Sequence, residues 1–240
     1  MDKIKIGIPG LDEILKGGVR SDASILFTGP PGSGKSIAAF QFVYYGAKQG
    51  MPGLYITSEE NAFSLRAHMA ELGFPLDSLE TKGLVTIAEQ SVTSGKMISI
   101  EAPIKLIKSK KIKRVVMDSL TLFEFVYGDS VNEFRKGIIS FIKQMKEAGV
   151  TLVVTSERYT AEMDQFKYRS EDFLFDGLII LSKIRKGSSF ERILNVSKLR
   201  GQDHLIDIFP FQIAKGGIKV FPKQLPFSLI EQDIVKRSKK

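Results

Sequence analysis

A glycine-rich segment that ends in a lysine and a serine is the strongest chemical signal in this chain. It runs from Gly29 to Ser36, reads G-P-P-G-S-G-K-S and fits the pattern G-x-x-x-x-G-K-[S/T]. Glycines in such a segment let backbone N–H groups converge on phosphate oxygens, and a helix that begins there adds its positive end. We expect Lys35 to reach the β- and γ-phosphates of ATP and Ser36 to hold Mg²⁺. The predicted nucleotide contacts of this segment, called the P-loop below, are Gly29, Pro30, Pro31, Gly32, Ser33, Gly34, Lys35, Ser36 and Ile37.

Asp118 is the second candidate for chemistry. It follows the apolar run Val115-Val116-Met117, which predicts a buried strand. In a parallel α/β sheet, ligands bind at the carboxyl ends of the strands, so Asp118 is placed to support the Mg²⁺ shell. An aspartate that merely begins a loop has the same pattern. The P-loop favours the functional interpretation, because its metal needs a carboxylate partner.

Two adjacent glutamates, Glu59 and Glu60, follow the predicted strand over residues 54–58. Hydrolysis needs a group that orients water, and residue 119 is a serine, so Asp118 is not followed by a glutamate. The alternative is that both acids only stabilise the start of a helix. The residue pattern alone leaves these two interpretations equally open.

The elements that must position these groups alternate along the chain as short apolar runs and longer amphipathic ones. This alternation is typical of an α/β fold with a mostly parallel sheet flanked by helices. Asn61 is the expected cap of one helix, which Gly73 and Pro75 end. We predict strands over 24–28, 54–58, 84–88, 115–117 and 151–155, and helices over 35–49, 61–72 and 131–145.

The C-terminal part changes to an antiparallel pattern. The runs 178–183 and 193–198 flank a Lys-Gly-Ser-Ser turn, and 206–213 and 218–221 flank a Gly-Gly pair, so both read as hairpins. Residues 1–222 are therefore predicted to form a single domain. Residues 223–240 are predicted to be a basic, partly disordered tail.

The amino-acid composition excludes a disulfide-stabilised protein and gives no sign of a membrane-spanning segment. The 240 residues are 43% hydrophobic, include no cysteine and have no apolar run near the roughly 20 residues that cross a bilayer. The first residues lack the apolar segment of a signal peptide, so we expect a cytoplasmic protein without a membrane partner. The net charge of +8 is concentrated in a lysine cluster over 105–114 and in the C-terminal tail. Such runs are more often solvated surface than a nucleic-acid footprint.

Several ordered segments resemble the KaiC-like ATPases of the RecA superfamily, over about residues 4 to 215 of this chain. Residues 7–18 resemble the stretch that precedes the family's P-loop, and 55–60 its catalytic-glutamate strand. Asp118-Ser119, the Ser-Glu-Arg run at 156–158 and the run K-L-R-G-Q-D-H at 198–204 also match. Together these motifs are far more specific than any one of them.

The resemblance implies a RecA-like fold that assembles into rings, usually hexamers, with ATP between subunits. It implies that Glu59 is the base and Glu60 its helper. It further implies that Lys198 and Arg200 reach the neighbouring subunit's γ-phosphate, while Gln202 and His204 lie close to that interface as candidate nucleotide-binding residues. From spacing alone, Lys198 and Arg200 stand two residues apart at a strand end and point to one face. A solvated strand end is the alternative there.

Two departures from the family's clock proteins bear on function. Those proteins carry two tandem ATPase domains, whereas one is predicted here. Their autophosphorylated Ser-Thr pair aligns with Asp172 and Phe173, which cannot repeat that chemistry. We therefore expect a slow ATPase without autokinase activity. The chain looks like the single-domain archaeal KaiC-like and RadA-paralogue group.

Three functions are compatible with this sequence. The first is a ring-forming ATPase switch that acts on an unidentified protein partner, and the second is a recombinase paralogue that binds single-stranded DNA and regulates recombination or repair. The third is a scaffold that binds ATP and barely hydrolyses it. RecA-like proteins meet DNA through the loops that here follow Asp118 and Thr155. The second loop has aromatic residues, yet residues 157–172 carry five acids against three bases, a net charge of −2. We expect weak DNA binding at most.

Overall fold

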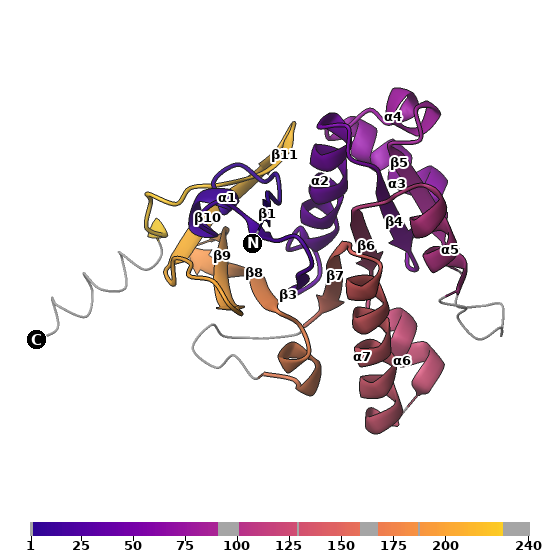
Figure 1. Ribbon diagram of the computed structural model, residues 1–240. Coiled ribbons are helices and arrows are strands. Elements are labelled where there is room, and N and C mark those ends of the chain that lie inside the picture. The colour runs from indigo at the N-terminus through magenta and orange to yellow at the C-terminus, as the bar shows by residue number, and fades with distance from the viewer. Residues whose placement is uncertain (1, 91–100, 129, 159–167, 187, 228–240) are drawn as a thin grey trace, which may run out of the picture.

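A nine-stranded sheet forms the centre of the computed structural model, which describes residues 2–90, 101–128, 130–158, 168–186 and 188–227 (Figure 1). The strand order is β11-β10-β9-β8-β3-β7-β6-β4-β5. The six strands from β8 to β5 in this order are parallel: β3 (Ser24–Gly29), β4 (Gly53–Thr57), β5 (Val85–Glu89), β6 (Arg114–Asp118), β7 (Thr151–Glu157) and β8 (Gly177–Lys186). Their carboxyl ends therefore meet at one edge of the sheet.

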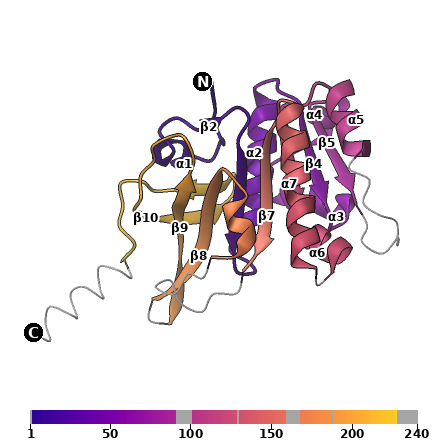
Figure 2. The ribbon, with the colours of Figure 1, turned by 60° about the horizontal axis from the view of Figure 1, so that its bottom comes forward.

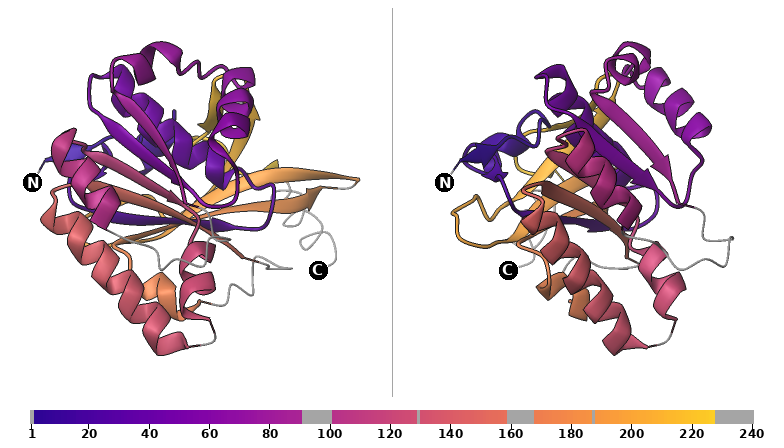
Figure 3. Two further views of the ribbon diagram at one scale, coloured as in Figure 1. Left: turned by 90° about the vertical axis from the view of Figure 1, so that its right-hand side faces the viewer. Right: turned by 45° about the vertical axis from the view of Figure 1, so that its right-hand side comes forward.

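The antiparallel extension lies beyond β8. It consists of β9 (Ser189–Leu199), β10 (Ile208–Ala214) and β11 (Gly217–Val220), each antiparallel to the strand before it. The β8–β9 hairpin projects from the body of the molecule (Figure 3, left). This arrangement confirms the predicted fold class, an α/β sheet that is mostly parallel with antiparallel C-terminal strands.

Helices cover both faces of the sheet, and each face has its own apolar core. One core contains Phe40 and Phe42 of α2 (Lys35–Lys48) and Leu65 of α3 (Ala62–Glu71). The other contains Ile107 of α5 (Glu101–Ser109) and Phe141 of α7 (Val131–Glu147). Figure 2 shows α2 and α7 on opposite sides of the parallel strands. Strands buried on both faces are continuous apolar runs, which explains why the sequence pattern revealed them.

The predicted parallel strands and main helices are all present, with ends that differ by a few residues. Asn61 caps α3 as expected, since its side chain accepts a hydrogen bond from the Ser64 N–H at 2.8 Å. The sequence did not reveal several short elements: α1 (Leu11–Ile14), α4 (Asp77–Thr81), α6 (Thr121–Tyr127), the 3₁₀ turn η3 (Ser170–Phe173), β1 (Lys3–Ile4) and β2 (Val19–Arg20). Elements of two to seven residues are too short to show a clear hydrophobic period.

The structure describes residues 223–227 of the predicted C-terminal tail. Of the predicted basic tail, 228–240 lie outside the described residues, so its disorder stays a prediction, as does the single domain over 1–222. Among the helices that the structure describes, none combines the length and the apolar character that a membrane crossing requires.

Candidate functional site

The P-loop joins the end of β3 to the start of α2, the strand–loop–helix context that the motif requires. Glycine is needed at Gly29, because a Cβ there would lie 1.9 Å from the Leu181 carbonyl oxygen. Gly34 has φ +101° and directly precedes α2, whose N-terminus has no side-chain cap among the described residues. The first N–H groups of α2 are therefore donors for a ligand, and the helix dipole favours an anion there.

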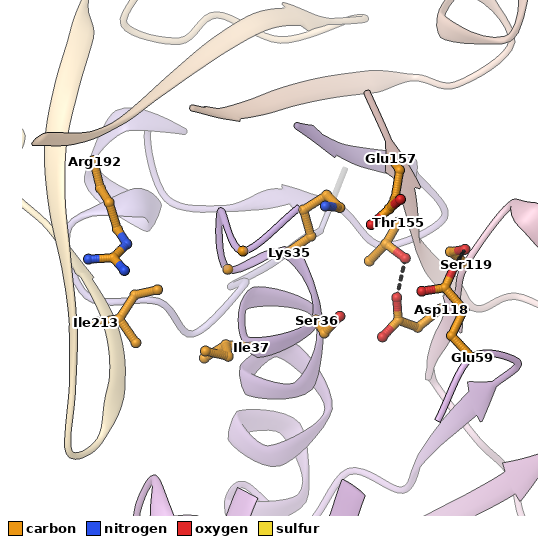
Figure 4. Close-up of a pocket in the computed structure, with 12 residues that line it drawn as sticks. Lys35, Ser36, Ile37, Glu59, Asp118, Ser119, Thr155, Glu157, Arg192 and Ile213 are labelled. Atoms are coloured by element: carbon orange, nitrogen blue, oxygen red, sulfur yellow. Dashed lines mark hydrogen bonds between the residues drawn. The ribbon is translucent and has the colours of Figure 1, made fainter. Parts of the chain in front are cut away.

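A cavity of about 390 Å³ opens beside this loop (Figure 4). Residues from the P-loop, from the ends of β4, β6 and β7, and from β9 and β10 surround it. It is lined by Gly32, Gly34, Lys35, Ser36, Ile37, Glu59, Asp118, Ser119, Thr155, Glu157, Arg192 and Ile213. The acidic and hydroxyl side chains gather on one side of the start of α2, and Arg192 lies with Ile213 on the other. A polyanion with an apolar end could be accommodated between them.

Asp118 is held from both sides by hydroxyl donors on the neighbouring strands. The Tyr55 hydroxyl on β4 donates to one carboxylate oxygen at 2.5 Å, and the Thr155 hydroxyl on β7 donates to the other. Burial and the Asp118 charge raise the pKa of Tyr55 well above its ordinary value, so this hydroxyl remains a donor at neutral pH. The carboxylate of Asp118 is thus fixed in a position that faces Ser36 across the cavity.

Glu59 is likewise fixed by hydroxyl groups, and here the donors lie between the end of β6 and the first residue of α6. Its carboxylate accepts hydrogen bonds from Ser119 and, at 3.1 Å, from Thr121. Ser58 ties the two loops together, since its N–H donates to the Asp118 carbonyl oxygen at 2.8 Å. Glu60 is not a cavity residue: its carboxylate lies 2.6 Å from Nδ1 of His68 on α3. The structure therefore places Glu59 at the cavity and Glu60 outside it, and the roles of base and helper that the resemblance implies stay predictions.

Lys35 is buried and its ammonium group donates to the Pro30 carbonyl oxygen of its own loop at 3.1 Å. Burial lowers its pKa, and the nearby carboxylates of Glu157, Asp118 and Glu59 oppose that shift. A bound polyphosphate would supply the negative charge that favours the ammonium form. Lys35 can therefore exchange a carbonyl oxygen for phosphate oxygens.

Five cavity residues were missing from the predicted site: Ser119, which directly follows Asp118, and Thr155, Glu157, Arg192 and Ile213. Thr155 and Glu157 belong to the end of β7, and the register of Gly29 with Glu157 places them next to the P-loop. Both residues could have been predicted from the assumption that each strand next to the P-loop strand contributes its carboxyl-end residues to the site. Arg192 and Ile213 come from antiparallel strands, and no local sequence signal marks them.

The pair predicted to act on a neighbouring subunit lies away from this cavity. Lys198 donates to the carbonyl oxygens of Asp172 at 3.1 Å and Phe173 at 3.3 Å. Arg200 donates to the same Phe173 oxygen at 2.7 Å, so both side chains point to one face, as their spacing predicted. Burial and the Arg200 charge lower the pKa of Lys198. Both side chains are thus bonded within the chain, and their role in a neighbouring subunit's site stays a prediction.

Gln202 and His204 make contacts within the chain. The Gln202 amide donates to the carbonyl oxygens of Leu15 at 3.1 Å and Gly18 at 2.8 Å, which ties the loop after β9 to the N-terminal elements. The His204 ring lies 3.1 Å from the Val196 carbonyl oxygen. Neither residue lines the P-loop cavity, so their predicted proximity to bound nucleotide stays a prediction that requires a neighbouring subunit.

The described residues fit a magnesium nucleotide. Among the described residues, the Nε of the cavity residue Arg192 is buried without a hydrogen-bond partner, which a bound nucleotide could supply. Within the described residues, no three carboxylate or histidine side chains converge to hold a metal by themselves. Mg²⁺ in nucleotide sites is usually held by one or two protein ligands together with phosphates and water. Ser36 and Asp118 are the residues here that would hold it.

Comparison with known proteins agrees with this geometry. The family model for the KaiC ATPase matches residues 4–225. The circadian clock oscillator protein KaiC of Parasynechococcus marenigrum strain WH8102 is 32% identical over 232 residues, which covers 92% of this chain and 45% of that protein. KaiC of Synechococcus elongatus is 30% identical with similar coverage. The chain thus spans less than half the length of these curated relatives.

A solved structure of similar length also matches. The crystal structure of a KaiC-like protein from the hyperthermophilic archaeon Pyrococcus horikoshii OT3 superposes with a TM-score of 0.81 and 31% sequence identity. The match covers 92% of this chain and 99% of that one. The family model, the curated relatives and the fold lead to the same conclusion: the chain belongs to the KaiC-like ATPases of the RecA superfamily.

Proposed function

We propose that this protein binds Mg-ATP in the P-loop cavity and hydrolyses it slowly, as a ring-forming switch that acts on protein partners. One observation carries the proposal: Lys35, Ser36, Asp118 and Glu59, which come from three strand ends, converge on one cavity. A phosphate-binding loop, a metal-supporting carboxylate and a second carboxylate that can orient water are the parts that phosphoryl transfer to water needs.

Each residue then has a distinct part in the reaction. The P-loop N–H groups and Lys35 bind the phosphates, and Ser36 and Asp118 would hold Mg²⁺, which would supply positive charge to neutralise the phosphates. Glu59 orients the attacking water and accepts its proton. The water oxygen forms a bond to the γ-phosphorus while the bond to the β–γ bridging oxygen breaks, which releases ADP and phosphate. Arg192 lies where it can contact the far end of the nucleotide.

The neighbouring subunit's Lys198 and Arg200 complete this site in the proposed ring, which is expected to be a hexamer. Their side chains lie outside their own cavity and share one backbone acceptor. Positive charge beside the γ-phosphate stabilises the charge that develops in the transition state. With Asp172 and Phe173 in place of a phosphorylatable pair, phosphate transfer to the protein itself is not expected.

Phosphate release and ATP titration by the wild-type protein and Lys35→Ala test this proposal. The wild type is expected to bind ATP and release phosphate in the presence of Mg²⁺. Lys35→Ala is expected to lose binding, because it removes the one cation of the P-loop. Equal phosphate release by both proteins would show that another site, or a contaminant, hydrolyses ATP. Mass measurement of the oligomer in the same samples tests the ring.

Tyr55→Phe should raise the Mg²⁺ concentration needed for half-maximal turnover by about 10-fold or more, since residues that orient metal ligands commonly affect affinity on that scale. The change removes only the hydroxyl that donates to Asp118 at 2.5 Å. Tyr44→Phe is the matched control, because the Tyr44 ring packs on Phe40 and Phe74 away from the cavity. Equal Mg²⁺ dependence of both variants would mean that the Tyr55 hydrogen bond does not position Asp118.

DNA binding should be weak, independent of sequence and lost steeply as salt rises, because the excess positive charge lies in 105–114 and in the C-terminal tail, outside the loops expected to meet DNA. Arg158, one of three basic residues over 157–172, is buried in an ion pair with Asp172 and so is not available to phosphates. Fluorescence anisotropy with a labelled single strand, run with ATPase assays, checks this. Tight binding at physiological salt together with faster ATP turnover would favour the recombination alternative.

A further inference from the structure

A buried ion pair outside the P-loop cavity has no part in the chemistry described so far. One guanidinium nitrogen of Arg158 lies 2.5 Å from both carboxylate oxygens of Asp172. Their side chains are only 4% and 1% exposed. Removing two charges from water carries a large desolvation cost, so a buried ion pair is weak evidence for a role in stability alone. The contacts at each end of the pair indicate what else it does.

The Arg158 end is attached to the nucleotide cavity of its own subunit. Arg158 follows Glu157, the last residue of β7, whose side chain lines the cavity. The backbone N–H of Arg158 donates to the carbonyl oxygen of Gly29, the first residue of the P-loop, at 3.0 Å. The position of Arg158 is therefore tied to the position of the P-loop.

The Asp172 end is attached to the two cations proposed to serve the neighbouring subunit. Asp172 lies in η3, the short turn drawn in orange-brown beside the lower end of α7 in Figure 1. Its carboxylate also accepts the Arg169 N–H at 2.8 Å, which closes the turn. The carbonyl oxygens of Asp172 and Phe173 at the end of this turn are the acceptors for Lys198 and Arg200.

We propose that Arg158 and Asp172 are positioning residues that hold Lys198 and Arg200 in the direction of the neighbouring active site. The ion pair fixes the turn, the turn fixes the two carbonyl oxygens, and these oxygens orient both cations. Because Arg158 is also bonded to Gly29, the same contacts link each subunit's own P-loop to the cations that it presents to the next subunit. This inference rests on the proposed shared site.

Asp172→Asn is the first variant, because it removes the charge and retains the shape of the side chain. Its turnover is expected to fall by about 100-fold, the effect that a displacement near 1 Å of a catalytic group can have. Its affinity for ATP is expected to stay within about threefold of wild type, since its own P-loop is unchanged. Glu80→Gln is the control: it breaks the ion pair with Arg66 between α4 and α3, outside the cavity, and should retain wild-type turnover.

Subunit-mixing experiments distinguish a displacement of Lys198 and Arg200 from general damage to the protein. Glu59→Gln subunits retain Lys198 and Arg200 and lack a working cavity, whereas Asp172→Asn subunits have an intact cavity and displaced cations. Mixed oligomers should recover about a quarter of wild-type turnover, the share of head-to-tail interfaces that pair the two intact parts at random. A mixture of Asp172→Asn with Arg200→Ala should recover nothing, because both lack correctly placed cations.

The reference mixture, Arg200→Ala with Glu59→Gln, makes the outcomes distinguishable. If the reference recovers and the Asp172→Asn mixture does not, with mixed oligomers confirmed by mass, the shared site stands and the positioning role is wrong. Wild-type turnover by Asp172→Asn alone would overturn the positioning role too. If the reference fails, the shared site falls and this inference falls with it.

A second variant covers the case in which Asp172→Asn does not fold. Breaking one partner leaves the other as an unpaired buried charge, whereas removing both charges is often tolerated. Arg158→Met combined with Asp172→Asn is therefore expected to fold and to lose turnover in the same way. Its turnover should be restored by mixing with Glu59→Gln subunits and not by mixing with Arg200→Ala subunits. The reverse result would overturn the proposal.

Discussion

Glu59→Gln is expected to lower the turnover of ATP by about 100- to 10,000-fold, the range over which general acid–base groups contribute. Glutamine cannot accept the proton of the attacking water, although it can occupy the same space. The Glu59 carboxylate lines the cavity and is oriented by Ser119 and Thr121. Binding of ATP should change little, because Lys35 and the P-loop N–H groups make the phosphate contacts. Nucleotide titration and single-turnover hydrolysis measure the two effects separately.

Glu60→Gln is the matched control for this prediction. It makes the same chemical change one residue later, at a side chain that pairs with His68 and does not line the cavity. We expect a small loss of turnover, in keeping with a helping role. If Glu60→Gln blocked hydrolysis and Glu59→Gln did not, the base would be Glu60 and the loop after β4 would have to rearrange when ATP binds.

Arg200→Ala is expected to lower turnover by about a thousandfold or more, the effect of removing a cation that stabilises charge on the transferred phosphoryl group. ATP affinity should remain nearly intact, because Arg200 contacts the Phe173 carbonyl oxygen and lies outside its own subunit's cavity. A loss confined to turnover is the signature of an interaction made only in the transition state. Kinetics and nucleotide titration on the same sample measure it.

Arg66→Ala provides the comparison for Arg200→Ala. Arg66 is also a hydrogen-bonded arginine, with partners on Glu80, and lies on α3 away from the cavity. It should retain wild-type turnover. If Arg200→Ala weakened ATP binding as strongly as it slowed hydrolysis, Arg200 would act as an ordinary binding residue instead.

The residue pattern could predict most of the sheet and the phosphate-binding part of the site for a clear physical reason. Strands buried on both faces are continuous apolar runs, and the P-loop combines a local backbone requirement with a fixed spacing. Gly29 illustrates this: the Leu181 carbonyl oxygen leaves no space for a Cβ. Such constraints are visible in a single segment of the chain.

The supports of Asp118 could not be predicted in the same way, because they depend on the order of the strands. In the sheet, β6 lies between β7 and β4, so Thr155 and Tyr55 reach Asp118 from opposite sides. Chain order alone does not give this arrangement. Arg192 is a similar case, since β9 brings it to the cavity through antiparallel pairing with β8 and β10. The residue pattern likewise does not rank Glu59 above Glu60: the family resemblance names Glu59 as the base, and only Glu59 lines the cavity.

Mixing Arg200→Ala with Glu59→Gln subunits tests most directly whether the ATPase site is shared between subunits. Each variant alone should be nearly inactive. Where an Arg200→Ala subunit presents its intact cavity to the cations of a Glu59→Gln subunit, a complete site forms. In a head-to-tail ring with random exchange, about a quarter of wild-type turnover should return. Mixed oligomers that are confirmed by mass and remain as inactive as the separate variants would contradict a shared site.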